Sequence, residues 1–178
     1  MAKKDLLVIE MNNKEDMECF NFREKLKIAQ KPYDYFKEIE NLNFDQLASS
    51  DRIFLQDFGI YNNELNDEEF MLRLRFPAGR ISNNSLLLIS NLAQKYNLQI
   101  ILTARAGIQL HGLDSNNILE VFNQINSQNI SSYQSFGDNI RNITSDIFDG
   151  IGVYNIIEVF PYIEQMQAYI LNHRDYLG

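Results

Sequence analysis

The chain has 178 residues, of which 45% are hydrophobic and 22% are charged, and its formal net charge is −8. That composition is ordinary for a soluble globular protein and excludes wholesale disorder. The acidic balance argues against general nucleic-acid or anionic-membrane binding, because both need a broad basic surface. No apolar run reaches the ~18 residues of a membrane span, and no signal-peptide pattern opens the sequence, so we expect a cytoplasmic protein.

The sequence contains one cysteine, Cys19. A single thiol can neither close an intrachain disulfide nor hold a cysteine-ligated iron–sulfur cluster, which needs about four thiolates. We therefore expect no metal ligands in this chain, and we interpret Cys19 as a buried or half-buried small residue.

The first third of the chain carries weak periodic patterns. Residues 14–31 and 33–42 repeat apolar side chains at imperfect helical spacing and mix both signs of charge, which predicts surface helices. Arg52–Tyr61, with the sequence RIFLQDFGIY, is rich in aromatic and β-branched residues. That segment predicts a strand or an extended stretch, followed by a long polar turn.

Two alternating segments dominate the middle of the chain. In the first, Leu72, Leu74 and Phe76 alternate with two arginines, which predicts a strand with one apolar and one cationic face. In the second, Ile100 to His111, every even position is apolar and several odd positions are polar. This second pattern predicts a single strand that presents a hydroxyl, a guanidinium, an amide and an imidazole in one row.

Between these segments, Pro77–Arg80 ends the first strand, and its glycine permits close approach of the backbone to a ligand. Ser82 is a candidate N-cap for a helix that buries Leu88, Ile89 and Leu92. The unit is strand–helix–strand, and a right-handed crossover would pair the two strands in parallel.

The last third predicts a helix over Ser115–Gln128, a short edge strand over Ile130–Phe136 and a tight loop over Gly137–Asn142. A long amphipathic helix is expected over Val153–Tyr176. The first of these helices would pack on the sheet and return the loop to the polar face. Arg73 and Arg141 would then flank one pocket, with the polar row Thr103, Arg105, Gln109 and His111 on the same face as Arg73 and Arg75.

Charge is distributed unevenly along the chain. Between Met71 and Arg141 there are six Lys or Arg and three acids, a net of +3, so the remainder carries −11. Polar outer faces are normal on a sheet with one side in water, and that interpretation stays open. The two polar rows contain no acid, however, and arginine suits bidentate recognition of carboxylates. The alternative interpretation is that the two polar rows form a surface that binds a multiply charged anion.

Three motifs carry a family resemblance: FMLRLRFPAGRIS, LTARAGIQLHGL and GDNIRNIT, in that order. Together they closely resemble the nitrite and sulfite reductases that use sirohaem coupled to a [4Fe–4S] cluster. The resemblance implies an α+β fold with a ferredoxin-like half-domain (strand–helix–strand–helix) over residues 66–136. It also implies an N-terminal helical arm over 1–65 and, over 137–178, the incomplete start of the sirohaem-binding α/β domain.

By resemblance, Arg73 and Arg141 match the family's substrate-binding arginines. Sirohaem contacts are implied for a second set: Arg75, Arg80, Thr103, Arg105, Gln109, His111 and Asn142. Plainer alternatives remain open, namely surface salt bridges for Arg75 and Arg80, a structural role for His111 and a loop cap for Asn142. The chain departs from the family pattern at Ala104 and Ala106, and at Ile101, where some members carry another arginine.

Family members reduce nitrite to ammonia or sulfite to sulfide with six electrons, holding the cofactors between two half-domains. This sequence shows one half-domain and lacks both the cluster's cysteine motifs and the basic Pro-Arg-Lys run of its relatives. We therefore expect an inactive portion that needs the missing C-terminal half or subunit, with ferredoxin or a reductase as electron donor. The portion could be an expressed fragment, a truncated gene product or a split subunit.

Two alternatives from other classes stay open. One is a cofactor-free interaction module or gene remnant that uses the arginine face to bind an acidic partner. The other is a sirohaem carrier without catalysis. The motifs are common to nitrite and sulfite reductases, so both substrates remain candidates.

Overall fold

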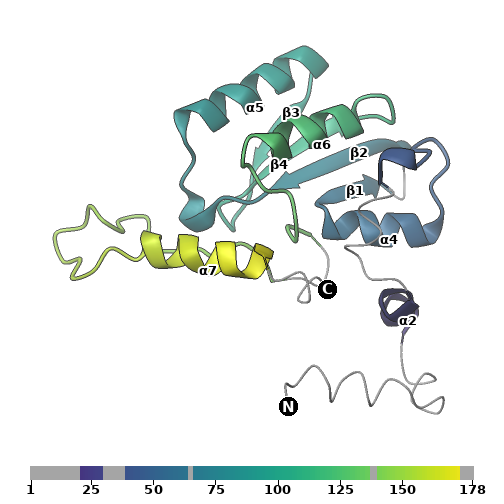
Figure 1. The fold of residues 1–178 in the computed structure, drawn as a ribbon. Coiled ribbons are helices and arrows are strands. Elements are labelled where there is room, and N and C mark those ends of the chain that lie inside the picture. The colour runs from purple at the N-terminus through teal and green to yellow at the C-terminus, as the bar shows by residue number, and fades with distance from the viewer. Residues whose placement is uncertain (1–20, 30–38, 64–65, 137–139, 173–178) are drawn as a thin grey trace, which may run out of the picture.

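The computed structural model describes residues 21–29, 39–63, 66–136 and 140–172 (Figure 1). Helix α2 (Phe22–Ala29) lies within the predicted helix 14–31, and the 3₁₀ turn η2 (Ile39–Asn41) lies at the end of the predicted helix 33–42. Asn21 and Leu42 are not helical, and the other residues of those two predictions fall outside the described part. Within the described residues, no helix has the length and apolar character needed to cross a membrane.

A four-stranded sheet forms the centre of the fold, in the order β1-β2-β4-β3. Its strands are β1 (Ile60–Asn63), β2 (Asn66–Leu74), β3 (Gln99–Leu102) and β4 (Ile108–Leu113), and all three pairings are antiparallel. Helix α5 (Asn83–Tyr96) connects β2 to β3, and α6 (Ile118–Ser127) follows β4. The predicted mixed α/β fold with helices packed on a sheet is confirmed.

One face of the sheet is closed by apolar side chains. Leu72 faces Leu110 across β2 and β4, and Leu74 faces Ile108, and all four side chains are buried. They belong to one core cluster with residues of the two helices, namely Ile89 and Leu92 of α5 and Ile118, Val121, Phe122 and Ile125 of α6. Figure 1 shows α5 and α6 together over this sheet, with α6 in contact with both α5 and β2. The opposite face, which carries Arg73, is left for other contacts.

The prediction of one strand over Ile100–His111 is wrong, because the segment folds into the hairpin β3–β4. The turn closes where Thr103 N donates to Gly107 O at 2.9 Å and Gly107 N donates to Thr103 Oγ1 at 3.0 Å. Ala106 has a positive φ of 54° at this turn. The apolar alternation continues through both alanines, so periodicity alone concealed the reversal. As a result β3 is an edge strand, and Ile100 and Leu102 are 41% and 77% exposed instead of buried.

The predicted parallel pairing of the two arginine-bearing segments is also wrong. Strand β2 pairs with β4 in antiparallel register, with Arg73 opposite Gln109. Strand β3 runs in the same direction as β2, but β4 lies between them. Because the segment forms a hairpin, β4 takes the position beside β2 that β3 would occupy in a simple strand–helix–strand unit.

The strand predicted over Arg52–Tyr61 is a helix for most of its length. Helix α4 (Ser49–Asp57) buries Phe54 and Leu55, and β1 begins only at Ile60. The Asp51 carboxylate accepts a hydrogen bond from Ala48 N at 3.0 Å, which stabilises the start of the helix. A short apolar run does not distinguish a helix from a strand, and this one is mostly helical in the structure.

The C-terminal segment is partly as predicted. Helix α6 buries the expected face, and Ser131 forms an isolated antiparallel bridge with Arg75 in the predicted edge segment. Helix α7 (Phe160–Asn172) is shorter than the helix predicted over Val153–Tyr176, because residues 153–159 are not helical. It packs against the 3₁₀ turn η3 (Pro77–Gly79), which follows β2.

Candidate functional site

A cavity of about 150 Å³ lies at the end of β2, beside the β3–β4 turn and the loop that contains Arg141. A water molecule takes up roughly 30 Å³ of liquid, so the space accommodates an anion of a few atoms. Most of the lining is polar: Arg73, Leu74, Arg75, Thr103, Ala104, Arg105, Gly107, Gln109, Ser135, Arg141 and Asn142. A larger hollow of about 350 Å³ between α5 and α6 is lined by Ser, Asn, Gln and Leu side chains, without a charged group.

Arg73 and Arg141, the two predicted substrate arginines, thus line one cavity although they stand far apart in the chain. Arg73 leaves β2 on the face opposite the core, and its neighbour across the sheet is Gln109. Thr103 and Arg105 reach the same cavity from the β3–β4 turn. These side chains line one cavity, but Thr103 and Arg105 reach it from a turn and not from the strand face that the sequence predicted.

Gln109 connects Arg73 to His111. In the amide orientation that satisfies both neighbours, its oxygen accepts from Arg73 Nε at 2.9 Å and also from Nη2, and its nitrogen donates to His111 Nε2 at 3.0 Å. His111 is half-buried and does not line the cavity itself. It therefore reaches Arg73 through Gln109.

Three arginines produce a strongly cationic site. Burial lowers the pKa of Arg73 below its ordinary value, and the positive charges of Arg141 and Arg105 lower it further. Each guanidinium keeps its charge, because arginine does not deprotonate under ordinary conditions. The repulsion among them is relieved when an anion enters the cavity, and the site favours anionic ligands for that reason.

Arg75 does not form a surface salt bridge. Its side chain is only 2% exposed, and its Nη2 donates to Arg141 O at 2.8 Å, with a longer bond of 3.4 Å from Nη1 to Tyr133 O. Burial lowers the pKa of Arg75 to about 10. The guanidinium borders the cavity but is bonded to the backbone, which makes Arg75 an anchor for the Arg141 loop.

Asn142 is a second anchor. Its Nδ2 donates to Phe76 O at 2.7 Å and to Arg105 O at 2.9 Å, so one amide joins the end of β2, the β3–β4 turn and its own loop. Its Oδ1 is buried without a hydrogen-bond partner in the part of the chain that the structure describes. The loop-cap interpretation of Asn142 accounts for the amide nitrogen, and the oxygen remains available to a ligand.

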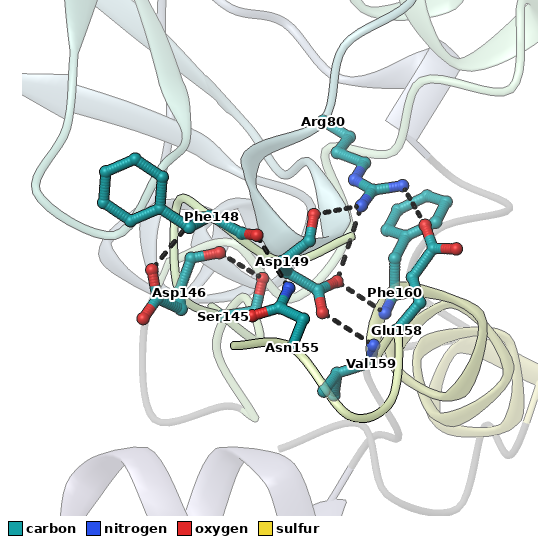
Figure 2. Close-up of polar contacts among 9 residues, drawn as sticks. All are labelled: Arg80, Ser145, Asp146, Phe148, Asp149, Asn155, Glu158, Val159 and Phe160. Atoms are coloured by element: carbon teal, nitrogen blue, oxygen red, sulfur yellow. Dashed lines mark hydrogen bonds and ion pairs between the residues drawn. The ribbon is translucent and has the colours of Figure 1, made fainter. Parts of the chain in front are cut away.

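Arg80 lies outside the cavity lining, and Figure 2 shows its surroundings. Its Nη1 contacts Glu158 Oε1 at 2.9 Å, and its Nη2 donates to Asp149 O at 3.0 Å. The guanidinium also stacks over the Phe160 ring, with its Cζ 4.2 Å from the ring centroid. The salt-bridge interpretation of Arg80 is confirmed, and this contact ties η3 to the start of α7.

Sequence reasoning missed one aromatic side chain at the site. The Phe136 ring centroid lies 4.5 Å from Arg73 Cζ and 6.0 Å from Arg141 Cζ. The Tyr61 ring from β1 packs against Phe136 at 5.0 Å between centroids. The only sequence clue was the position of Phe136 directly before the GDNIRN motif.

The donor set fits some cofactor groups and not others. The guanidinium, amide and hydroxyl donors of the lining suit the carboxylates of a macrocycle rim, whereas Asn142 Oδ1 is an acceptor and does not. An iron–sulfur cluster does not fit these residues. No group of three or more His, Cys, Asp or Glu side chains that could hold a metal occurs among the described residues, and the whole sequence has one cysteine.

Comparison with known proteins identifies the half-domain. The family model described as the nitrite/sulfite reductase ferredoxin-like half domain matches residues 63–128, which include β2, α5, β3, β4 and α6. Over residues 63–128 the chain has the ferredoxin-like half-domain of the nitrite/sulfite reductase family.

Relatives from both branches of the nitrite/sulfite reductase family match. The ferredoxin–nitrite reductase of Leptolyngbya laminosa is 27% identical over 158 residues, covering 84% of this chain and 31% of that protein. The sulfite reductase (NADPH) hemoprotein beta-component of Paenibacillus sp. is 33% identical over 97 residues, covering 51% of this chain and 17% of that protein. The chain thus spans a third or less of the length of these nitrite/sulfite reductase relatives.

The fold also matches a solved structure. The Mycobacterium tuberculosis NirA protein superimposes with a TM-score of 0.76 at 20% sequence identity, covering 89% of this chain and 33% of NirA. At this identity the likeness establishes the fold. It extends beyond residues 63–128, so the elements outside the half-domain also follow the NirA architecture.

Proposed function

We propose that the chain supplies the arginine-bearing wall of a nitrite or sulfite reductase active site, with Arg73 and Arg141 binding the substrate oxyanion. One observation carries the proposal: both arginines line a single cavity of about 150 Å³ that also contains Arg105. Charge-assisted hydrogen bonds from guanidinium to an oxyanion are short and strong. In the proposed role, the two arginines hold the anion and polarise its oxygens as the N–O or S–O bonds weaken.

Sirohaem is the cofactor that this proposal requires. Thr103, Arg105 and Gln109 would hold its rim carboxylates, with His111 orienting Gln109 and with Arg75 and Asn142 fixing the backbone around them. When bound, the sirohaem iron supplies the electrons to the substrate. Residues 137–178 are proposed to begin the sirohaem-binding domain, after the half-domain at 66–136 and the arm at 1–65.

A [4Fe–4S] cluster in the complete enzyme would have to be ligated by residues outside the present sequence, because one cysteine does not suffice. We propose that the present residues act together with such ligands and are inactive alone. Ferredoxin is the proposed electron donor and nitrite the first substrate to test, since two of the nitrite reductase relatives are named for ferredoxin. Sulfite is the second, because a sulfite reductase component also matches.

The anion site can be tested with the chain alone. The purified protein is titrated with sodium nitrite and sodium sulfite while the arginine Nε–Hε signals are followed by NMR. We expect saturable shifts of Arg73 and Arg141, and their loss in the Arg73→Gln variant. Lys95→Gln is the matched control, because it removes one positive charge at an exposed pair with Glu120 elsewhere on the surface. Equal loss in the control, or no saturable shift in the unaltered chain, would count against the proposal.

A further inference from the structure

We infer that Phe136 is a positioning residue that holds the guanidinium groups of Arg73 and Arg141 together at the cavity. This inference rests on the proposed function of those two arginines. The Phe136 ring lies 4.5 Å from Arg73 Cζ and 6.0 Å from Arg141 Cζ, so one aromatic side chain contacts the cations from both motifs.

The arrangement needs an attractive element because its charges repel one another. The pKa of Arg73 is lowered by burial and then by the nearby charges of Arg141 and Arg105, which means that the charged form is disfavoured there. Among the residues that the structure describes, no carboxylate lines the cavity. The face of an aromatic ring attracts cations within about 6 Å of its centroid through its quadrupole. Phe136 thus supplies an attraction that an incoming anion does not have to displace.

The ring is itself held in place. Tyr61 of β1 packs on it with centroids 5.0 Å apart and an angle of 37° between the planes. Ser135, the preceding residue, has its Oγ 2.7 Å from Arg73 O, which fixes the backbone beside the ring to β2. Phe136 is half-buried and is not a member of the hydrophobic core cluster of the described residues. The ring contacts Tyr61 and both arginines at the edge of the core.

Each arginine is then held from two sides. Gln109 engages the Nε and Nη2 edge of Arg73, and Phe136 covers the face of the same group. For Arg141, Arg75 binds the backbone carbonyl at 2.8 Å, and Phe136 lies beside the guanidinium. Holding both groups in place before the ligand arrives reduces the ordering cost of binding, which raises affinity without a new contact to the anion.

The test uses the full chain and variants of Phe136. Phe136→Leu and Phe136→Met both lack the ring, and Phe136→Tyr keeps it. The Nε–Hε signals of Arg73 and Arg141, assigned with Arg→Lys variants, report the ring directly, because an aromatic face displaces them upfield. Dissociation constants for sodium nitrite are measured on the same samples. Phe44→Leu is the control, since it removes an aromatic side chain from the core pair with Phe70.

In the ringless variants we expect the Arg73 signal to lose its upfield displacement and nitrite to bind about threefold to tenfold more weakly, in line with a cation–π contact. Phe136→Tyr should keep both properties, and Phe44→Leu should keep the displacement and the affinity. Unchanged affinity in a ringless variant, an unmoved Arg73 signal, or a Phe136→Tyr variant that behaves as ringless would overturn the inference. A chain that binds no anion would overturn the proposed function instead, and the ring-current measurement would still decide the role of Phe136.

Discussion

Two of the predicted site arginines, Arg75 and Arg80, are anchored by contacts far along the chain. Arg75 borders the cavity and donates to backbone carbonyls, whereas Arg80 lies outside the cavity and pairs with Glu158. Residue type and alternation placed Arg73 and Arg75 on one predicted strand face and did not distinguish them. The difference comes from contacts across 66 to 78 positions of sequence, which no local pattern contains.

Arg141 and Arg105 should differ in their effects when the cofactor-loaded enzyme is assembled. Arg141→Ala is expected to weaken nitrite binding and slow its reduction tenfold or more, because a charge-assisted hydrogen bond contributes about 1.5–3 kcal/mol. Arg105→Ala is expected to lower sirohaem occupancy instead. Sirohaem absorbance and steady-state kinetics on both variants distinguish the two roles. Equal cofactor loss in both would mean that Arg141 is only a structural anchor.

Replacing Arg75 tests its assignment as an anchor. Arg75→Met removes the donor to Arg141 O and leaves that carbonyl short of a partner, so we expect the free energy of unfolding to fall by about 1–3 kcal/mol. The methionine also fills part of the space, which limits any cavity term. Urea unfolding followed by circular dichroism measures the change. A variant as stable as the unaltered chain would show that the buried charge costs as much as its bonds contribute.

At the scale of elements, the β3–β4 turn determines where Thr103 and Arg105 lie. Two neighbouring positions in it should respond in opposite directions. Ala106→Gly removes the steric cost of a positive φ of 54° and is expected to stabilise the fold by roughly 0.5–1 kcal/mol. Gly107→Ala should destabilise it, since the added Cβ would lie 2.8 Å from Leu74 O of β2. Thermal unfolding of the pair measures both, and changes of the same sign would contradict the turn geometry.

Asp149 links the arginine-bearing half-domain to α7. Its Oδ1 accepts from Val159 N at 2.7 Å and its Oδ2 from Phe160 N at 2.9 Å, where the helix begins (Figure 2). Losing a carboxylate cap costs about 1 kcal/mol or somewhat more, so Asp149→Ala should speed amide hydrogen exchange in α7. Glu158→Gln, at an exposed pair with Arg80, should leave exchange near that of the unaltered chain. If exchange were faster in Glu158→Gln but not in Asp149→Ala, Glu158 and not Asp149 would be the cap of α7.

The sequence pattern predicted helices correctly where neighbouring residues in the chain stabilise them. Ser82 accepts a hydrogen bond from Ser85 N at 3.1 Å as the N-cap of α5, and the periodic face of α6 is buried as predicted. The pattern failed at Ala104 and Ala106, where small apolar residues continue a strand alternation through a turn. It failed again at Phe54 and Leu55, which lie in a helix, because a short apolar run does not distinguish a helix from a strand.

The candidate site was predictable to a similar extent. The meeting of Arg73 and Arg141 followed from the order of elements, because a helix packed on the sheet must return the chain to it. The roles of Phe136 and Asn142 did not follow. Both act through contacts with β2 or the β3–β4 turn, and those contacts depend on the final packing and not on any periodic pattern.

On the scale of the whole molecule, one face of the sheet stabilises the fold and the other face carries residues of the proposed chemistry. Its apolar face packs with α5 and α6 in one core cluster, and its polar face carries Arg73 and Gln109 toward the cavity. The β3–β4 turn and the Arg141 loop complete the cavity from outside the sheet. The arginines can therefore be altered without disturbing the core cluster, with Arg75 as the exception because it is buried.

The same division predicts the metal content of the purified chain. The cationic cavity offers donors for carboxylates and oxyanions but no ligand for iron, and a cysteine-ligated cluster needs about four thiolates, of which the sequence has one. We expect the monomer to contain no stoichiometric iron or acid-labile sulfide and to lack iron–sulfur absorbance. Iron and sulfide assays after anaerobic purification measure this, with a ferredoxin–nitrite reductase relative treated in parallel as the positive control. A stoichiometric cluster in the monomer would require ligands other than thiolates, and it would contradict the proposal that residues outside this sequence supply the ligands.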